Sequence, residues 1–388
     1  MRILLVSPFD YGVAGGVNEH IAALDREFQR RGHDTRILAA ASPNEGERDD
    51  GHVHRIGVAY PLPSNGSRAR IAMSPMVTLR VRNFLASEPF DIVHAHEPLT
   101  PMLCLAALMH ARSATVGTFH ASRPSNIMYH YTKAILDLFF ERIDIRVAVS
   151  EAARTFVDTY FPAEFEIVPN GIELLHYGED VLPLPELMDG RPNILFVGRF
   201  DEPRKGLRYL VQAMPLVRSQ YPDARLIVVG EGESDRYQRA LEASGIHDTV
   251  WAGYVSHERK ARYYASCDVF CAPSVGRESF GIVLLEAMAT RKPVVAAANE
   301  GYAAVISDGE TGVLVPPRDG HALALAIVRV LADRDFRERI AAAGLRRAGD
   351  FAWPVVAERL LDVYDRAMVA RAAPVTRVWP TEIAGRRG

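Results

Sequence analysis

Short apolar runs alternate with amphipathic helical segments along most of the chain. The pattern begins with a predicted strand at residues 3–6, continues with a helix at 17–31 that Gly32 ends, and returns to a strand at 35–39. Parallel strands need crossover connections, which helices usually supply. The alternation therefore predicts a parallel α/β fold. Further strands are expected at residues 92–95, 115–118, 147–149 and 166–168.

The alternation stops once, at a stretch with three prolines and a glycine. Residues 183–192 show no helical periodicity, so we predict a linker there. After it we expect strands at 193–197, 226–229, 269–271, 294–297 and 313–315, and helices at 207–220, 235–244 and after 281. We therefore predict two doubly wound domains, at 1–182 and 193–371, with a flexible tail at 372–388. The ligand is expected between the carboxyl ends of the strands.

Composition narrows the class of protein. Hydrophobic residues make up 48% of the chain and charged residues 24%, which is typical of a soluble globular protein, and the net charge of -3 provides no general attraction to nucleic acid. No apolar run approaches the ~18 residues of a spanning helix, so we expect a cytoplasmic protein. Cys104, Cys267 and Cys271 lie in apolar segments and indicate neither a disulfide nor a zinc site.

Two glutamates bracket a glycine-bearing turn in the last third of the chain. Glu278 and Glu286 are eight residues apart, which is about two helical turns. The first amide groups of a helix have no partner inside it, so Phe280, Gly281 and Ile282 can bind an anion or a hydroxyl group. The alternative is a surface helix with two unrelated glutamates.

A basic loop follows the first predicted strand of the second half. Arg199, Arg204 and Lys205 precede a helix, and cations are unfavourable near a helix N-terminus. The loop therefore predicts a bound anion such as a diphosphate, whose charge these residues would stabilise as it departs. The alternative is an ordinary solvated basic loop.

Glycines also follow the first strand of the chain, at Gly15 and Gly16. Glycine lets a backbone approach a phosphate or a sugar, although a plain helix-entry turn explains the two residues as well. The spacing is not G-x-G-x-x-G, and no acid follows the second strand in the position expected for a nicotinamide ribose. Both facts disfavour a dinucleotide site.

Histidines end two of the predicted strands. His120 lies where a parallel sheet binds ligands, although a structural histidine is the alternative. His94 and His96 share a strand face and are expected to line the ligand site, since no third metal ligand is evident. Asp333 and Asp335 are interpreted as a helix-capping turn. We therefore predict no metal site and no tightly bound cofactor.

The E-x7-E spacing of Glu278 and Glu286 resembles the signature of the retaining glycosyltransferases of family 4, which have the two-domain GT-B fold. The resemblance implies a nucleotide-sugar donor bound mainly by the second domain, and a final helix, beginning near residues 351–353, that crosses back to the first. The implied catalytic residues are His120, Arg199, Lys205 and Glu278. The implied donor contacts are Gly15, Gly16, Arg199, Lys205, Phe280, Gly281, Ile282 and Glu286.

One segment of the first half is strongly basic. Residues 51–87 contain five arginines and no aspartate or glutamate. This predicts an anionic partner, either a phosphate-bearing acceptor or a membrane surface, and a solvated face is the alternative. Arg80 and Arg82 lie on a predicted amphipathic helix with Phe84, which favours a peripheral contact with the inner face of the plasma membrane.

Up to about residue 370, the chain looks most like the bacterial phosphatidylinositol mannosyltransferases of this family. That likeness implies GDP-mannose as donor and an inositol phospholipid as acceptor. The implied acceptor residues are Asn65, Ser67, Arg68 and Arg70. The chain departs from the pattern at Ser64 and Ala72, where an aromatic and a basic residue are expected.

Three alternatives remain open. The first is a transferase that uses a UDP-sugar and a polysaccharide or another lipid. The second is a silent scaffold that binds a nucleotide sugar or a membrane, and the third is an epimerase of the same fold. For a transferase, front-face attack is favoured over a covalent intermediate, because no carboxylate in the motifs is clearly poised as a nucleophile.

Overall fold

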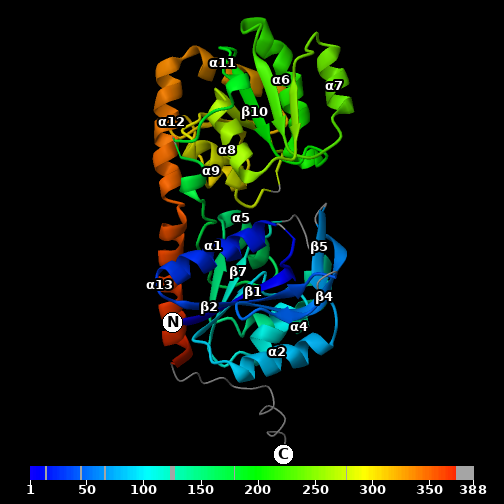
Figure 1. The fold of residues 1–388 in the computed structure, drawn as a ribbon, viewed down its shortest axis with the longest axis vertical. Coiled ribbons are helices and arrows are strands. Elements are labelled where there is room, and N and C mark those ends of the chain that lie inside the picture. Colours follow the sequence, from blue (N-terminus) through cyan, green and yellow to red (C-terminus); the bar gives the residue numbers. More distant parts are fainter. Residues whose placement is uncertain are drawn as a thin grey trace, which may run out of the picture.

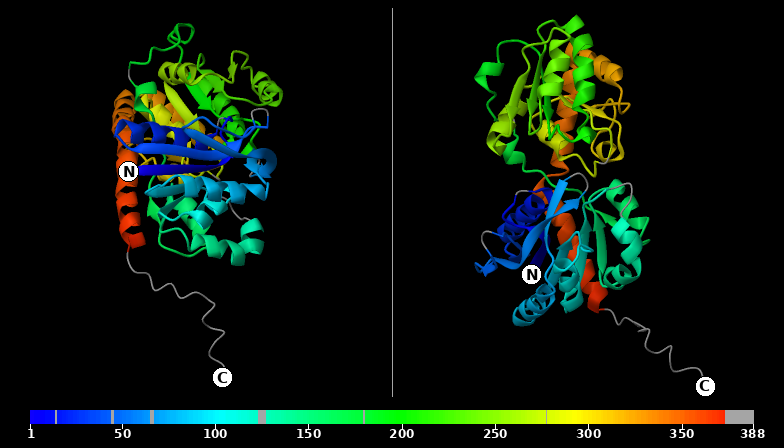
Figure 2. Two further views of the ribbon diagram at one scale, coloured as in Figure 1. Left: turned by 60° about the horizontal axis from the view of Figure 1, so that its bottom comes forward. Right: turned by 90° about the vertical axis from the view of Figure 1, so that its right-hand side faces the viewer.

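Two β-sheets, one in each of two lobes, organise the computed structural model (Figure 1). The structure describes residues 1–372 except 14, 44–45, 65–66, 123–126, 179 and 277. We call the part around the nine-stranded sheet the first lobe and the part around the six-stranded sheet the second lobe. Figure 2 shows the same two lobes from two other directions.

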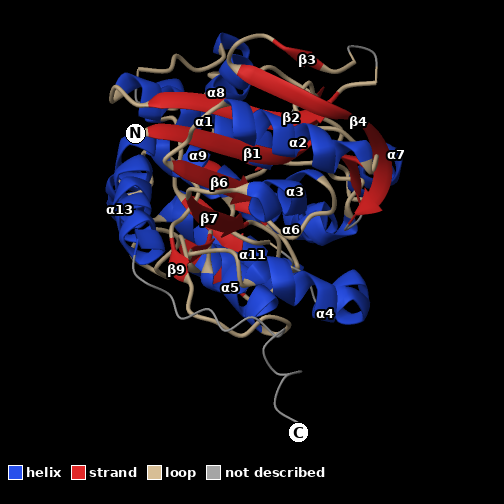
Figure 3. Cartoon of the chain, turned by 90° about the horizontal axis from the view of Figure 1, so that it is seen from below, coloured by secondary structure: helices blue, strands red, loops and turns tan. Residues whose placement is uncertain are grey.

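The first sheet has the order β2-β4-β5-β1-β6-β7-β8-β9, with β3 paired to β4. Its strands are β1 (Arg2–Asp10), β2 (Asp34–Ala41), β3 (Arg48–Asp49), β4 (Val53–Ser64), β5 (Ser67–Ala72), β6 (Ile92–His96), β7 (Ala114–Phe119), β8 (Ile145–Ala148) and β9 (Glu166–Ile167). Strands β1, β6, β7 and β8 are parallel neighbours, as predicted, and Figure 3 shows the first three side by side. The antiparallel β4–β5 pair was not predicted.

The second sheet is parallel throughout, in the order β12-β11-β10-β13-β14-β15. Its strands are β10 (Asn193–Val197), β11 (Arg225–Val229), β12 (Val250–Gly253), β13 (Val269–Ala272), β14 (Val294–Ala297) and β15 (Val313–Val315). All but β12 were expected. Together the two sheets confirm the α/β fold class.

Helices connect the strands in both lobes. They are α1 (Gly16–Arg30), α2 (Met76–Ser87), α3 (Leu103–His110), α4 (Ile127–Phe140), α5 (Glu151–Asp158), α6 (Leu207–Gln220), α7 (Asp235–Glu242), α8 (His257–Ser266), α9 (Ile282–Ala289), α10 (Glu300–Ala303), α11 (Gly320–Ala332), α12 (Arg334–Gly349) and α13 (Trp353–Ala372). Asp333 caps α12 by accepting a hydrogen bond from the Phe336 amide, which confirms the predicted capping turn. Among the described residues, no helix has the length and apolar character needed to span a bilayer.

Helix α13 follows the second lobe in sequence but packs against α1, β7 and β8 of the first lobe, as Figure 1 also shows. Val356, Leu360 and Tyr364 are buried with Ile3 and Leu5 in one apolar cluster. The chain therefore crosses between the lobes twice. The two crossings run side by side, because Ile172 and Ala352 form a parallel β-bridge.

Candidate active site

Two loops meet at the carboxyl ends of neighbouring strands in the second sheet. One follows β10 through the short 3-10 helix η3 (Pro203–Lys205), and the other follows β13 and leads into α9. Ser274 Oγ donates to the Arg204 carbonyl at 2.9 Å. Gly206 permits this approach, because its φ is 75° and a Cβ there would lie 2.0 Å from the Pro273 carbonyl oxygen.

Glu278 lies among cations where these loops meet. Its Oε1 is 2.8 Å from both Arg204 Nη1 and Lys205 Nζ. Glu202 pairs with Arg199 and with Arg204. A diphosphate bound here stays a prediction, but the cations do not require one for balance, because Glu202 and Glu278 supply counter-charges within the chain. Sequence reasoning had assigned neither glutamate to that task.

Helix α9 begins beside the same cluster. Its N-cap, Gly281, has a φ of 100°, and a Cβ there would lie 2.6 Å from the Tyr302 ring. Among the described residues, the backbone amides of Phe280, Gly281 and Ile282 donate no hydrogen bond. The structure thus brings these three amides into the loop that carries Glu278, where they can bind a ligand oxygen.

Glu286 is buried, with 5% of its surface exposed. Its Oε1 lies 2.7 Å from Lys260 Nζ and accepts from Tyr177 OH at 2.9 Å, while its Oε2 accepts from Tyr264 OH at 2.8 Å. Burial and the nearby carboxylate raise the pKa of Tyr177 and Tyr264, so both hydroxyls stay protonated donors. A ribose hydroxyl could reach Glu286 only by sharing or displacing one of these partners. The sequence did not indicate any of the three.

Three histidines from separate elements meet at the carboxyl end of the first sheet. His20 comes from α1, His96 ends β6, and His120 follows β7; their ring centroids are 4.9 to 5.3 Å apart. One ring nitrogen from each lies within 4.8 Å of the other two. The sequence showed no third ligand beside His94 and His96, whereas the structure places His20 and His120 next to His96. The missing partner comes from α1, which no local spacing reveals.

His94 has a structural position instead. Its Nδ1 is hydrogen-bonded to Tyr364 OH in α13 and its Nε2 to Thr118 Oγ1 in β7, each at 2.7 Å. The prediction that His94 lines the ligand site is wrong, because its side chain is completely buried between α13 and β7. His94 thereby ties α13 to the first sheet.

Burial keeps the three clustered histidines uncharged. It lowers the pKa of His20 to about 4 and the pKa of His96 and His120 well below the ordinary value. A charged imidazole would lose its hydration in such a place. At neutral pH the cluster therefore presents neutral nitrogens.

The backbone beside His120 is held by Glu97. Glu97 Oε1 accepts from the amides of His120 and Ala121, at 2.8 and 2.7 Å. Glu97 itself has a φ of 49°, a left-handed conformation that is costly for a residue other than glycine.

The first lobe brings other predicted residues to the end of β1. Gly15 and Gly16 begin α1, and a Cβ at either would meet no described atom within 4 Å, so packing alone does not require glycine there. Arg70 Nη1 lies 3.7 Å from Asp10 Oδ2, at the last residue of β1. Arg70 therefore lies beside the strand end that leads into the glycine loop.

The other predicted acceptor residues are described only in part. Asn65 lies outside the described residues. Ser67 and Arg68 belong to β5, but their side chains lie outside the description. Arg70 is thus the one predicted acceptor residue whose side chain the structure describes.

In the structure, acids from outside the segment offset part of the positive charge of residues 51–87. Arg55 pairs with Asp50 at 2.8 Å and Arg80 pairs with Glu47, both acids from outside the segment. Arg82 is exposed and has no ion pair among the described residues. The sequence therefore overstated the excess of positive charge.

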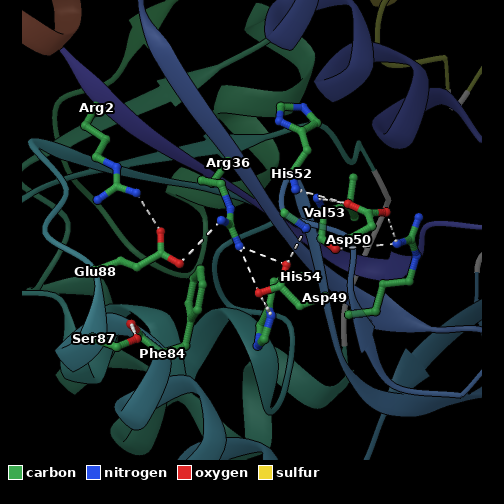
Figure 4. A network of polar contacts seen from close by, with 12 residues as sticks. Arg2, Arg36, Asp49, Asp50, His52, Val53, His54, Phe84, Ser87 and Glu88 are labelled. Atoms are coloured by element: carbon green, nitrogen blue, oxygen red, sulfur yellow. Dashed lines mark hydrogen bonds and ion pairs between the residues drawn. The ribbon is translucent and has the colours of Figure 1, made fainter.

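Helix α2 is anchored to the first sheet, as Figure 4 shows. Arg2 and Arg36 both pair with Glu88 just after the helix, at 2.7 and 3.4 Å. Phe84 points into the core and stacks on His54, with ring centroids 4.4 Å apart. Phe84 therefore lies on the buried side of α2, whereas Met76 and Leu79 on the same predicted helix are exposed, at 52% and 45%. The predicted membrane contact of this helix stays a prediction.

Two family models match the chain and together span both lobes. The model "Glycosyltransferase Family 4" matches residues 14–174, and "Glycosyl transferases group 1" matches residues 191–333. The phosphatidyl-myo-inositol mannosyltransferase of Mycobacterium leprae is 38% identical over 370 residues, covering 94% of this chain and 96% of that protein. The enzyme of the same name from Mycolicibacterium smegmatis is 35% identical, covering 94% of each.

Solved structures share the arrangement of the two lobes. Sucrose-phosphate synthase from Thermosynechococcus elongatus matches with a TM-score of 0.74 and 23% identity, over 95% of this chain and 99% of that one. The Anabaena protein HepE, in complex with UDP and glucose, matches with a TM-score of 0.71 and 19% identity, over 94% and 100%. At these identities the match shows the fold, which is GT-B.

Proposed function

The chain belongs to the family-4 glycosyltransferases, and on that premise we propose that it transfers mannose from GDP-mannose to the inositol of a phosphatidylinositol-type lipid. The observation that carries this proposal is the 38% identity to a phosphatidyl-myo-inositol mannosyltransferase across 94% of the chain. The site contributes the chemistry: cations and free amides for a diphosphate, and carboxylates for sugar hydroxyl groups.

In this proposal the donor binds mainly to the second lobe. Its diphosphate lies against Arg199, Lys205 and the amides that open α9, while Glu278 and His120 hold the sugar. Lys205 can turn from Glu278 to the phosphate without leaving that carboxylate unpaired, because Arg204 stays on it at 2.8 Å. Fixed cations then stabilise the leaving diphosphate more in the transition state than in the ground state.

The acceptor in this proposal binds to the first lobe near Arg70 and the glycine loop of Gly15 and Gly16. Retention of configuration follows from front-face attack, in which the departing phosphate receives the acceptor's proton. The site favours this route because Glu278 is engaged by two cations and Glu286 by Lys260 and two tyrosines, so neither is free as a nucleophile.

Nucleotide binding tests the donor directly. We expect calorimetry to find that GDP binds more tightly than UDP or ADP, and GDP-mannose to be turned over with vesicles that contain phosphatidylinositol. Tighter binding of UDP would favour the second candidate, a UDP-sugar transferase with a different acceptor. That candidate is supported by HepE, which shares the fold and was solved with UDP.

A membrane contact would bring the enzyme to a lipid acceptor, and we propose that α4 makes it. Four apolar side chains at helical spacing form an exposed stripe on α4. They are Met128, Tyr131, Ile135 and Leu138, with 44, 82, 60 and 65% of their surfaces exposed. Helix α2, with exposed Arg80 and Arg82, packs into the same core cluster as α4. Exposed apolar side chains suit a lipid surface, and the cations of α2, which contacts α4 through α3, suit its negative charge.

We expect the double change Ile135→Ser and Leu138→Ser to weaken binding to phosphatidylinositol vesicles by about 10-fold or more, since burying such a side chain contributes about 1.5–3 kcal/mol. Vesicle co-sedimentation would measure it. Leu325→Ser on α11, also an exposed leucine at 52%, is the matched control. Calorimetric binding of GDP should be unchanged in the double variant and in Leu325→Ser. If the two variants sediment equally with the vesicles, the proposed role of α4 is contradicted.

A further inference from the structure

We propose that His20, His96 and His120 form a binding site for one divalent transition-metal ion that prefers imidazole ligands, such as Zn²⁺ or Co²⁺. One ring nitrogen from each residue lies within 4.8 Å of the others. Three histidines with a fourth position left for water are a common ligand set for zinc. The site is separate from the Glu278 loop, because all three residues belong to the first lobe.

Two ring nitrogens in this cluster lack a partner. His20 Nε2 and His96 Nε2 are both buried, and neither has a hydrogen-bond partner among the described residues. A buried polar atom without a partner is costly, and native proteins rarely leave one so. Of the two, His20 Nε2 is free to ligate an ion, while His96 would ligate through Nδ1, the nitrogen that faces His120 Nε2.

Asn170 orients His20 as a metal ligand requires. The Asn170 Oδ1 lies 3.0 Å from His20 Nδ1, and because an amide oxygen only accepts, the His20 proton is on Nδ1. The lone pair is then on Nε2, the atom without a partner. Ligating histidines almost always donate their second nitrogen to an oxygen in this way.

Protonation does not compete with the ion at neutral pH. Burial lowers the pKa of all three rings; His20 and His120 lower that of His96 further, and His20 lowers that of His120. A metal ion needs the neutral imidazole, so the ligands are already in the binding form.

Binding requires a small rearrangement. Nitrogens around a tetrahedral zinc ion stand about 3.4 Å apart, because each Zn–N bond is about 2.0–2.1 Å. The hydrogen bond between His96 Nδ1 and His120 Nε2, at 3.0 Å, would have to open. His120 is the residue that can move, because it follows the end of β7 and is less buried than the other two.

An ion at this site would remove His120 from the donor sugar. This consequence rests on the proposed function, in which His120 holds the sugar. We therefore expect Zn²⁺ to inhibit transfer and a chelator to restore it, with His130→Gln inhibited like the native enzyme.

The binding test needs no nucleotide or lipid, so its outcome does not depend on the proposed function. After treatment with a chelator, the full chain is titrated with Co²⁺ and followed by calorimetry and by the visible absorption of tetrahedral cobalt. We expect one ion per chain. His20→Gln should weaken binding at least 100-fold, whereas His130→Gln, a change of an exposed histidine on α4, should leave it unchanged.

Two results would overturn the proposal: no binding by the native chain, or equal binding by His20→Gln and the native chain. If His20→Gln does not fold, the native protein still provides a test. Zn²⁺ should raise its melting temperature at pH 7, because an ion that binds only the folded state stabilises it. No shift in the presence of excess Zn²⁺ would count against the site.

Discussion

Replacing Lys205 with alanine is expected to lower kcat/KM for sugar transfer by about 30- to 1,000-fold. A fixed donor aimed at developing charge contributes on the order of 2–4 kcal/mol to the transition state. In the proposed mechanism Lys205 stabilises the departing diphosphate, and Arg199→Ala should have an effect in the same range. Initial rates measured over a range of donor concentrations would separate a loss in kcat from a change in KM.

The structure explains why Lys205→Ala should still fold. Glu278 keeps its ion pair with Arg204 after the change, so no partly buried carboxylate is left alone. Equal unfolding midpoints for the variant and the native protein would verify this point. Arg346→Ala removes an exposed cation from α12 and should leave the rate unchanged. Full activity of both Lys205→Ala and Arg199→Ala would rule out the assigned donor site.

Acidification from pH 7 to pH 5 is expected to reduce the free energy of unfolding by on the order of 4 kcal/mol through His20 and His94 alone. Burial lowers the pKa of these residues to about 4 and about 3, from 6.5 in the unfolded chain. Between these values the unfolded chain binds protons that the folded protein does not. Stability is therefore lost as the pH falls below about 6.5, and it is fully present above that value.

Urea unfolding at pH 7, 6 and 5 would measure this effect. Averaged from pH 7 to pH 5, each of the two histidines contributes about 1 kcal/mol per pH unit, so His20→Gln should flatten the dependence by about that amount. His130→Gln, on the exposed side of α4, should not. The same slope in the native protein and in His20→Gln would show that His20 is not held neutral by burial.

The type of most elements could be predicted because it depends on local pattern. The helix expected at 207–220 is present with those bounds as α6, and the strands expected at 294–297 and 313–315 are β14 and β15. In each case the spacing of apolar residues along the chain indicates which face of the element is buried. The hairpin of β4 and β5 escaped prediction, because two prolines in β4 resemble a loop in sequence and only pairing with β5 makes the segment a strand.

The candidate site could likewise be predicted only where its chemistry is local. The sequence alone indicated the loops that carry Lys205 and Glu278, since each joins a strand to a helix and the chemistry of each is local. The counter-charge from Glu202 and the three partners of Glu286 became visible only in the structure. Those partners come from segments up to 109 residues away, and no spacing rule links them.

By itself, then, the sequence determined the fold class and the positions of the loops that bear charge, because hydrophobic periodicity and glycine placement act within a few residues. Tertiary structure alone decided which residues share a site. His20, His96 and His120 meet because α1 packs against the edge where β6 and β7 end. Contacts of this kind depend on how elements pack, and packing is not encoded in the spacing of any one segment.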